Sequence, residues 1–402
     1  MITIRKTALA ALAAASIALA MIAGTTAPAS AATSYGQLPV MGYNPWYQYG
    51  VHVTGAGLLH QASLLVSTGL AAAGYGGVYL DDGWMASART ASGALTWDTT
   101  KFPDGIPALA SQVHALGLKF GIYAAIGTRT CKNLPGSYGH YAQDAQTFAS
   151  WGVDYAKIDS CGGLPAGTTE AGAAADFTAY GSALRGAAIV YSEELPIPYI
   201  GTSYFLPAVQ TSERIANSWR VTHDESPAVS ASTTILGHLA ADLHLHGFAG
   251  PGHWNDLDML VTGVPVFGWT LAQEENQLSV WAEEASPLLL STDIQALTSA
   301  ELSALKNPYM ITIDQSGAQS PKAIMAGHIE ALMKPYPGGG VAVLLANLGT
   351  GTGSGHFSLS QFGITTARAS GYNVWTGRTT HFSGVSVTMA AGATILVIMK
   401  AA

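Results

Sequence analysis

Val153-Asp-Tyr-Ala-Lys-Ile-Asp159-Ser-Cys161 is the stretch of this sequence that predicts most about its fold. Its apolar, extended pattern is typical of a buried strand that carries Lys157 and Asp159 at its C-terminal end. In barrels of parallel strands the active site lies at that end. Asp159 is therefore the first candidate for a functional residue, as a nucleophile, a base or a metal ligand.

Similar apolar, β-branched runs recur along the first three quarters of the chain, with Ala- and Leu-rich stretches such as 60–73 and 106–116 between them. Strands that alternate with segments of helical length predict crossover connections and a parallel sheet. Eight such units over about 250 residues predict a closed (β/α)8 barrel, that is, a TIM barrel. The expected strands are 40–46, 77–84, 119–125, 153–159, 188–194, 218–224, 252–259 and 287–294.

The pattern changes near residue 307, beyond which short strand-like runs are separated by clusters of Gly, Ser and Thr. Since no helix-length period interrupts them, we expect a small antiparallel β-sandwich. We predict a catalytic barrel over residues 33–307 and a C-terminal β-sandwich domain over residues 308–402. Packing against the barrel is the expected role of the sandwich, and ligand binding is the alternative. The strand-like runs include 323–326, 340–348, 371–375 and 394–399.

Residues 1–32 have the pattern of a secretory signal peptide. Arg5 and Lys6 form a short basic start, an Ala-rich apolar stretch follows, and residues 29–31 offer a small-residue cleavage site. The apolar stretch is short for a membrane span, and no later apolar run is long enough. We expect a secreted, extracellular protein with no membrane partner after cleavage, and an uncleaved anchor is the alternative.

Charge and cysteine content narrow the class of protein further. The formal net charge of −8 becomes −10 without the leader, and no basic cluster remains, so nucleic acid is not an expected partner. Cys131 and Cys161 are the two cysteines, and an even number in an exported chain favours one disulfide. Two free buried thiols are the alternative.

Carboxylates, cations and aromatic rings gather at the expected C-terminal ends of the strands. Each residue alone is weak support for a site, but together they predict one shared cavity. A pyranose needs this mixture, because charged groups bind its hydroxyls and aromatic rings stack on its C–H face. The residues at these ends are Trp46, Asp81, Asp82, Trp84, Tyr123, Lys157, Asp159, Glu193, Glu194, Arg220, Asp224, Asp256 and Asp258.

Eight runs in order carry a family resemblance. They are Met41-Gly-Tyr-Asn-Pro-Trp46, Leu80-Asp-Asp-Gly-Trp-Met85, Gly117-Leu-Lys-Phe-Gly-Ile-Tyr123, Thr128-Arg-Thr-Cys131, Phe148-Ala-Ser-Trp-Gly-Val-Asp-Tyr155, Lys157-Ile-Asp-Ser-Cys161, Gly250-Pro-Gly-His-Trp-Asn-Asp-Leu-Asp-Met-Leu260 and Pro287-Leu-Leu-Leu-Ser-Thr-Asp293. In these runs the chain resembles glycoside hydrolase family 27, the family of retaining α-galactosidases, over nearly the whole expected mature length.

The resemblance implies a double-displacement mechanism in which Asp159 is the nucleophile and Asp224 the general acid/base. It also implies that Cys131 and Cys161 form a disulfide beside the nucleophile. Lys157 is the expected cation that keeps Asp159 ionised, and burial together with the charge of Asp159 is expected to raise the pKa of Asp224. The positions that match sugar-binding residues are Trp46, Asp81, Asp82, Tyr123, Lys157, Glu194, Arg220, Asp258 and Met259.

The resemblance implies release of terminal α-linked D-galactose from oligo- or polysaccharides, with carbohydrate as the partner and no cofactor or metal. Two departures from the family pattern stand out: Ser192-Glu-Glu-Leu-Pro196 replaces a typical Cys-Glu-Trp, and Glu283-Glu284 replaces small or apolar residues. The glutamate kept at position 194 disfavours N-acetylgalactosamine. β-L-Arabinopyranosidase activity, or a glucose-directed activity of the same family, is the alternative.

Three functions typical of other classes of protein fit these residues less well. A Schiff-base role for Lys157 is disfavoured, because the nearby Asp159 would raise the pKa of the amine. A metal-dependent hydrolase would use His253 with Asp256 and Asp258, with His244 and His246 as further ligands. Those two histidines are expected on a helix without a shared face, and the cluster has no recognised ligand spacing. A non-catalytic sugar-binding protein would have lost one of the two catalytic carboxylates, and both are present.

Overall fold

The computed structural model describes residues 35–320 and 322–402, so the expected signal peptide lies outside the described residues. Eight parallel strands form one sheet, and each of them falls inside one of the eight predicted ranges. Their residues are buried almost throughout, as the near-continuous apolar runs predict for a parallel sheet covered by helices. The strands are β1 (Met41–Tyr43), β2 (Gly77–Leu80), β3 (Lys119–Ala125), β4 (Tyr155–Asp159), β5 (Val190–Glu193), β6 (Ser218–Arg220), β7 (Trp254–Asp256) and β8 (Leu288–Leu290).

The order of the strands is that of a TIM barrel, which confirms the predicted fold class. Neighbouring strands pair in parallel in the order β7-β6-β5-β4-β3-β2-β1-β8. The seam between β7 and β8 is closed just beyond β7, where Leu260 bridges to Leu290 in parallel and its N–H donates to the carbonyl of Leu289 at 2.8 Å. The C-terminal ends of all eight strands therefore face the same side of the barrel.

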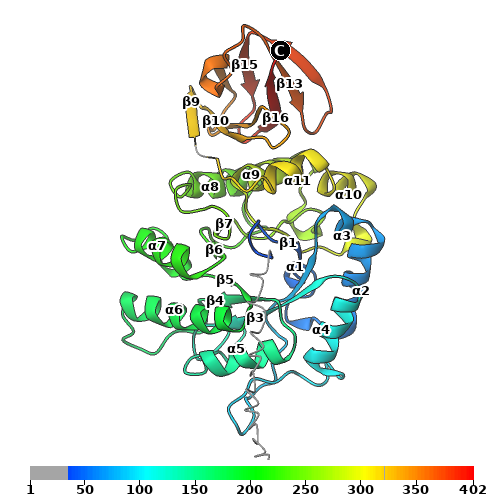
Figure 1. Ribbon diagram of the computed structural model, residues 1–402, viewed down its shortest axis with the longest axis vertical. Coiled ribbons are helices and arrows are strands. Elements are labelled where there is room, and N and C mark those ends of the chain that lie inside the picture. The colour runs from blue at the N-terminus through cyan, green and yellow to red at the C-terminus, as the bar shows by residue number, and fades with distance from the viewer. Residues whose placement is uncertain (1–34, 321) are drawn as a thin grey trace, which may run out of the picture. The chain divides into compact units, whose positions relative to one another are not determined.

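Helices follow the strands and cover the barrel (Figure 1). The single helix suggested by residues 60–73 is two helices, because Gly69 has a left-handed φ of 80° and ends the first. Among the described residues, no helix combines the length and the apolar character that crossing a bilayer requires. The helices are α1 (Trp46–Tyr49), α2 (Gly55–Ser67), α3 (Leu70–Ala73), α4 (Gly105–Ala115), α5 (Tyr141–Ser150), α6 (Glu170–Gly186), α7 (Phe205–Ile215), α8 (Ala231–Asp242), α9 (Leu271–Glu284), α10 (Ser299–Leu305) and α11 (Pro308–Asp314).

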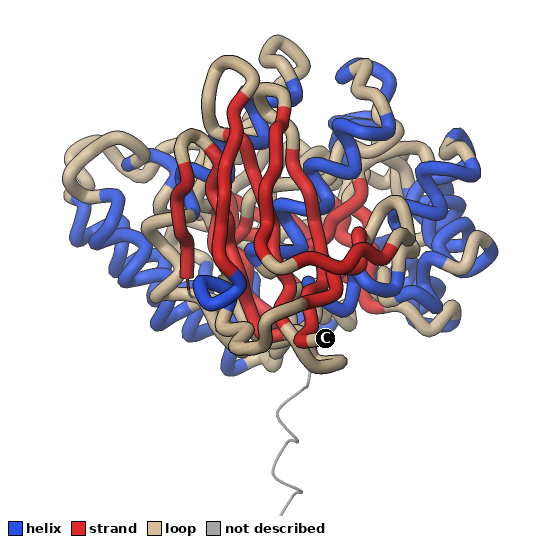
Figure 2. The backbone as a smooth tube through the Cα atoms, turned by 90° about the horizontal axis from the view of Figure 1, so that it is seen from above, coloured by secondary structure: helices blue, strands red, loops and turns tan. Residues whose placement is uncertain are grey.

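The C-terminal part is an antiparallel sandwich, as predicted. A six-stranded sheet in the order β14-β13-β16-β11-β10-β9 faces a two-stranded sheet of β12 and β15, and Figure 2 shows the long strands side by side. Helix α11 follows residue 307, and the first sandwich strand begins only at Lys322. The strands are β9 (Lys322–Ala326), β10 (Ile329–Pro335), β11 (Val341–Asn347), β12 (Gly353–Ser358), β13 (Ala369–Asn373), β14 (Thr379–Phe382), β15 (Gly384–Met389) and β16 (Thr394–Ala401).

The central strands of the six-stranded sheet, β10 and β11 among them, are buried on both faces. Leu344 and Leu396 belong to the same apolar core as the barrel, whereas their neighbours Val343 and Val397 pack in the core of the sandwich. This alternation follows from the two-residue period of a strand. Polar contacts add to the interface, because the indole N–H of Trp375 donates to Ser279 of α9 at 2.8 Å. The sandwich thus packs against α9 of the barrel (Figure 1).

Candidate active site

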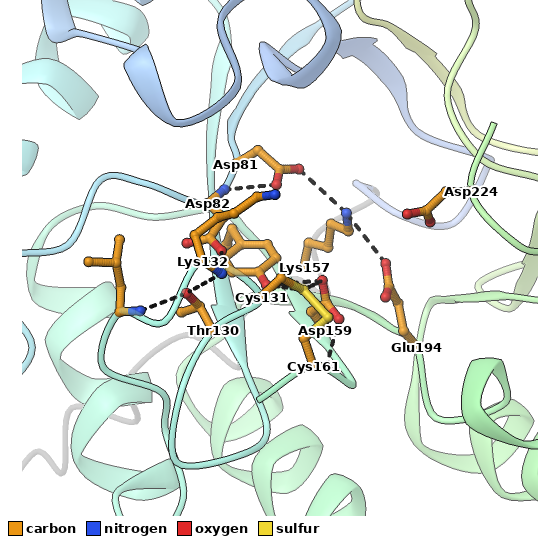
Figure 3. Close-up of a disulfide and its surroundings, with 12 residues drawn as sticks. Asp81, Asp82, Thr130, Cys131, Lys132, Lys157, Asp159, Cys161, Glu194 and Asp224 are labelled. Atoms are coloured by element: carbon orange, nitrogen blue, oxygen red, sulfur yellow. Dashed lines mark hydrogen bonds and ion pairs between the residues drawn. A yellow bond between two sulfur atoms is a disulfide. The ribbon is translucent and has the colours of Figure 1, made fainter. Parts of the chain in front are cut away.

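A cavity of about 200 Å³ lies at the C-terminal ends of the barrel strands. Every residue to which the family resemblance gives a role lines it except Asp258, and Figure 3 shows charged side chains around it. Three other residues predicted at the strand ends do not line it: Trp84, Glu193 and Asp256. Tyr47 and Lys132 line it as well, although nothing in the strand pattern pointed to them. The lining residues are Trp46, Tyr47, Asp81, Asp82, Tyr123, Cys131, Lys132, Lys157, Asp159, Cys161, Glu194, Arg220, Asp224 and Met259.

Asp159 is the last residue of β4, and its carboxylate is held by two donors. The hydroxyl of Tyr123 donates to Oδ2 at 2.9 Å, and the backbone N–H of Cys161 donates to Oδ1 at 2.8 Å. The side chain is 7% exposed, so only a small part of it reaches the cavity. These contacts fix the direction in which the carboxylate points, as positioning of a nucleophile requires.

Lys157 does not pair directly with Asp159, which corrects the expectation from the sequence. Its Nζ lies 3.4 Å from Asp81 Oδ2 and 3.4 Å from Glu194 Oε1, as the dashed lines in Figure 3 show. Burial alone would lower the pKa of Lys157, but the charges of three carboxylates, Asp81 first among them, hold it well above its ordinary value. A Schiff-base lysine needs the opposite shift, so that alternative finds no support here.

Asp81 and Asp82 follow β2 and both are buried. Asp81 accepts hydrogen bonds from Asn44 Nδ2 at 2.6 Å and from the N–H of Asp82 at 2.7 Å. Asp82 accepts from the N–H groups of Gly83 at 2.7 Å and Lys132 at 3.1 Å. Burial raises the pKa of Asp82 above its ordinary value, although its hydrogen bonds oppose the shift. Both carboxylates are thus held by hydrogen bonds inside the protein and are not exposed to open solvent.

Arg220, the last residue of β6, is surrounded by three carboxylates. Its guanidinium lies 3.0 Å from Asp258, 3.0 Å from Asp224 and 3.5 Å from Glu194. Burial, and then the charge of Asp159, raise the pKa of Glu194 to about 8. Glu194 and Arg220, two of the positions that match sugar-binding residues of the family, therefore lie side by side on the cavity.

Asp258 does not line the cavity, although the sequence predicted that it would. Its carboxylate pairs with Arg220 instead. Its Oδ1 pairs with the guanidinium of Arg220, and its Oδ2 accepts from the N–H of Glu225 at 2.7 Å. The backbone of Asp258 has a φ of 87°, which is rare for a residue other than glycine. Such strain is found at functional sites, and here it lets one carboxylate serve the loops after both β6 and β7.

Asp224 contradicts the expectation of a raised pKa. Its side chain is 80% exposed, and its Oδ1 accepts from Arg220 at 3.0 Å. The surrounding protein would raise the pKa of Asp224, but the charges of Arg220 and Lys157 outweigh that effect and hold the pKa below its ordinary value. The sequence argument counted burial and the charge of Asp159, but it did not foresee that Arg220 would pair with Asp224. In the unliganded protein Asp224 is thus a carboxylate at the rim of the cavity.

Trp46 is the first residue of α1 and forms one wall of the cavity, though β1 ends three residues before it. The ammonium group of Lys132 lies 5.1 Å from the centre of its ring, within the range of a cation–π contact. Lys132 follows Cys131 directly, so the loop that carries the disulfide also places a positive charge at this wall.

The predicted disulfide is present and joins the loops that follow β3 and β4. Cys131 and Cys161 are bonded, with their Cα atoms 4.9 Å apart. A Cβ at Gly162 would lie 1.5 Å from the carbonyl oxygen of Arg129, so only glycine lets the two loops approach this closely. The disulfide therefore holds Lys132 and the amide of Cys161, which contacts Asp159, in fixed positions.

Replacing both Cys131 and Cys161 with serine is expected to lower the free energy of unfolding by roughly 3–4 kcal/mol, the chain-entropy value for closing a loop of this length. The bond spans 30 residues of sequence. Guanidinium unfolding of both proteins measures the difference. Because the amide of Cys161 also orients Asp159, kcat is expected to fall as well. Unchanged stability would show that other contacts already fix the two loops.

Replacing Tyr123 with phenylalanine is expected to lower kcat about 10- to 100-fold, the range for losing one hydrogen bond to a charged group. Steady-state kinetics give the value. Tyr75→Phe is the matched control, since its fully buried hydroxyl donates to the carbonyl of Leu305 outside the cavity. An equal loss of activity in both variants would mean that Tyr123 acts only through stability.

The structure also shows where Glu193 and three of the histidines lie. Glu193, which replaces the family's cysteine, is fully buried and accepts a hydrogen bond from the N–H of Leu195, so it belongs to the core. Burial raises its pKa to about 8. His244 and His246 lie in the turns after α8, not on a helix as expected. The Nδ1 atom of His253 lies 2.9 Å from the carbonyl oxygen of Ala216, just before the start of β7.

A TIM barrel followed by an antiparallel sandwich, with carboxylates, a lysine and an arginine around one cavity, defines a glycosidase of the barrel type. A family model described as alpha galactosidase A matches residues 53–316, and one described as alpha galactosidase C-terminal beta sandwich domain matches residues 326–399. The chain belongs to the α-galactosidase family, glycoside hydrolase family 27.

Relatives and solved structures agree with this assignment. An alpha-galactosidase from Cyamopsis tetragonoloba is 35% identical over 333 residues, which cover 82% of this chain and 77% of that protein. The crystal structure of alpha-galactosidase I from Mortierella vinacea superimposes with a TM-score of 0.79 at 26% identity, covering 92% of this chain and 98% of the other. The chain spans 66% and 61% of the length of the relatives from Aspergillus clavatus and Aspergillus fumigatus.

Proposed function

We propose that the protein is a retaining α-galactosidase that releases terminal α-linked D-galactose by double displacement. The observation that carries the proposal is the placement of two differently held carboxylates on one cavity. Asp159 is buried and fixed by two donors, whereas Asp224 is exposed at the rim. Asp159 would attack the anomeric carbon while Asp224 protonates the leaving oxygen, and water activated by Asp224 would then hydrolyse the glycosyl-enzyme ester.

The size and lining of the cavity support a single terminal sugar as the group bound. About 200 Å³ is below the roughly 300–1,000 Å³ of pockets for drug-sized ligands, so one pyranose ring fits better than an extended chain. The buried pair Asp81 and Asp82 offers carboxylate acceptors to sugar hydroxyls. Glu194 offers a further acceptor and Arg220 offers donors on the same cavity. We infer that the pair at positions 81 and 82 binds O4 and O6, and the second pair binds O2.

The proposal is tested by hydrolysis of p-nitrophenyl α-D-galactopyranoside and p-nitrophenyl β-L-arabinopyranoside. We expect a higher kcat/KM for the galactoside, because the arabinoside lacks the hydroxymethyl group that Asp81 and Asp82 would bind. The ¹H NMR spectrum of the first product formed should show the α-anomer, as retention requires. A preference for the arabinoside would reassign the substrate and keep the mechanism. Binding of galactose without hydrolysis of any galactoside would identify a sugar-binding protein.

We further infer that the protein is exported and acts outside the cell. The support is the basic, apolar and small-residue pattern of residues 1–32, which precedes the described part of the chain. Mass spectrometry of the protein recovered from culture medium should give an N-terminus near residue 33. Recovery of the full-length chain from the membrane fraction would contradict this inference.

A further inference from the structure

A second group of ionisable side chains lies outside the active-site cavity, where α8 and α9 meet the segment that leads into the sandwich. Asp242 is the last residue of α8, His246 lies in the turns that follow, and Glu284 is the last residue of α9. Asp242 and Glu284 are fully buried, and the side chain of His246 is 13% exposed. His246 is thus the one of the three side chains that is partly exposed to solvent.

These three side chains converge on one point. One nitrogen or oxygen atom from each lies within 4.8 Å of the other two, and His246 Nε2 is 2.8 Å from Glu284 Oε2. Ligand bonds of about 2.0–2.2 Å in a tetrahedral site place neighbouring donor atoms roughly 3.4 Å apart. Small side-chain rotations therefore suffice for all three atoms to share one ion.

Several polar atoms in this group have no hydrogen-bond partner among the described residues. They include His246 Nε2, which is close to Glu284 without the geometry of a hydrogen bond, and Glu284 Oε1. The amide oxygen of Gln319 is a third, while its Nε2 points at Asp242 Oδ2 at 2.8 Å and Glu284 Oε2 at 3.5 Å. Buried polar atoms without partners are costly, and an unplaced ion is one cause of such a pattern.

Further acidic side chains surround the group and would favour binding of a cation. Glu283 and Glu330 are buried beside Asp242 and Glu284, whereas Lys334 is the buried lysine that faces them. The ammonium group of Lys334 donates to the carbonyl of Ala282 at 2.7 Å, and within the described part of the chain it forms no ion pair with these carboxylates. A divalent cation bound here would offset the charge of these carboxylates in their ionised form.

We propose that Asp242, His246 and Glu284 form a structural site for a divalent transition-metal ion such as Zn²⁺. One imidazole nitrogen and two carboxylates suit Zn²⁺ better than Ca²⁺, which takes six or more oxygen ligands. Rotation of the Gln319 amide by 180° would supply a fourth ligand, because it places the oxygen where the nitrogen now faces Asp242. Asn255 Nδ2 donates to Asp242 Oδ1 and orients this carboxylate, as second-layer residues do in metal sites.

The ion would connect the ends of α8 and α9 to the chain segment before β9. It would therefore join the barrel to the sandwich at the place where Glu283 and Glu284 depart from the family pattern. No catalytic role follows, since none of the three ligands lines the active-site cavity. The proposal is thus independent of the substrate and the mechanism inferred above.

The test is isothermal titration of ZnCl₂ into the untagged, chelator-treated mature protein at neutral pH. We expect one ion per chain, and a loss of affinity of at least 100-fold in Glu284→Gln and in His246→Gln. Glu283→Gln is the matched control, because Glu283 is equally buried but its carboxylate accepts from Ser320 and is not among the three ligands. Absence of binding by the wild-type protein, or equal affinity in all three variants, would overturn the proposal.

Thermal unfolding gives a second readout, and the response of the wild-type protein alone already tests the site. Addition of Zn²⁺ at 100 times its Kd should stabilise the wild-type protein and Glu283→Gln, and EDTA should reverse the gain. The same addition should leave the Tm of Glu284→Gln unchanged. If the glutamine variants do not fold, a wild-type Tm that fails to respond to Zn²⁺ still contradicts the site. Hydrolysis rates, measured in parallel, are expected to be equal with and without the ion.

Discussion

Replacing Asp159 with asparagine is expected to lower kcat by roughly 10⁴-fold or more, because a neutral amide cannot form the glycosyl-enzyme ester that we assign to Asp159. The substitution keeps the size of the side chain and leaves an oxygen to accept from Tyr123 or the amide of Cys161. Galactose should therefore still bind with similar affinity. Kinetics on p-nitrophenyl α-D-galactopyranoside and titration with galactose separate the two effects.

Asp154→Asn is the matched control for this substitution. Asp154 precedes the same strand at its opposite end, where it pairs with Lys119 at 2.8 Å and His114 at 2.7 Å. Its loss should leave kcat within about twofold of the wild-type value, since it touches nothing in the cavity. Near-normal turnover in Asp159→Asn would remove this residue from the mechanism.

Azide rescue assigns the role of Asp159 more strictly than a loss of activity does. In Asp159→Gly, azide can enter the space of the missing carboxylate and attack the anomeric carbon opposite to the leaving group. The product should then be β-galactosyl azide, with inverted configuration. Formation of the α-azide by this variant would contradict the assignment of Asp159 as the nucleophile.

Replacing Asp224 with alanine is expected to slow turnover in a way that depends on the leaving group. For a sugar or alkyl leaving group, which needs a proton, we expect kcat/KM to fall roughly 10²–10⁴-fold, the usual contribution of a general acid. For 2,4-dinitrophenyl galactoside, whose leaving group needs no proton, kcat/KM should change little. Azide should rescue this variant with formation of the α-azide, because the ester to Asp159 is still made.

The pH profile gives an independent check on Asp224. A general acid works in its protonated form, and Arg220 holds the pKa of Asp224 below its ordinary value in the free protein. The value of kcat/KM should therefore fall as the pH rises from acid towards neutral, and this limb should disappear in Asp224→Ala with an activated substrate. Equal losses for all leaving groups, with an unchanged profile, would exclude Asp224 as the acid/base.

Much of the architecture could be predicted because it depends on local patterns. Buried parallel strands need continuous apolar residues on both faces, so all eight strands are visible as runs such as Val153 to Asp159. Positions at strand ends are equally local, and for that reason nearly all of the predicted site residues meet on one cavity. The break at Gly69 was missed, because an isolated glycine in a helical pattern does not reveal whether its φ is positive.

Pairing between charged groups could not be predicted in the same way. Lys157 is two residues from Asp159 in the sequence, yet it pairs with Asp81 and Glu194 from neighbouring strands. Asp258 follows the same β7 tip as expected but turns to hold Arg220, because its positive φ directs the side chain behind the cavity. Lys132 reaches Trp46 only because the disulfide loop folds over it.

The sequence by itself determined the barrel, the sandwich that follows it, the family and the identity of the residues around the cavity. These depend on hydrophobic periodicity and on motifs, which are properties of short stretches of chain. Only the tertiary structure decided how deeply each charge is buried and which partner it meets. Both depend on distances between segments remote in sequence. For that reason the sequence predicted a raised pKa for Asp224, whereas the structure lowers it. For the same reason the group of Asp242, His246 and Glu284 is recognisable only in the fold.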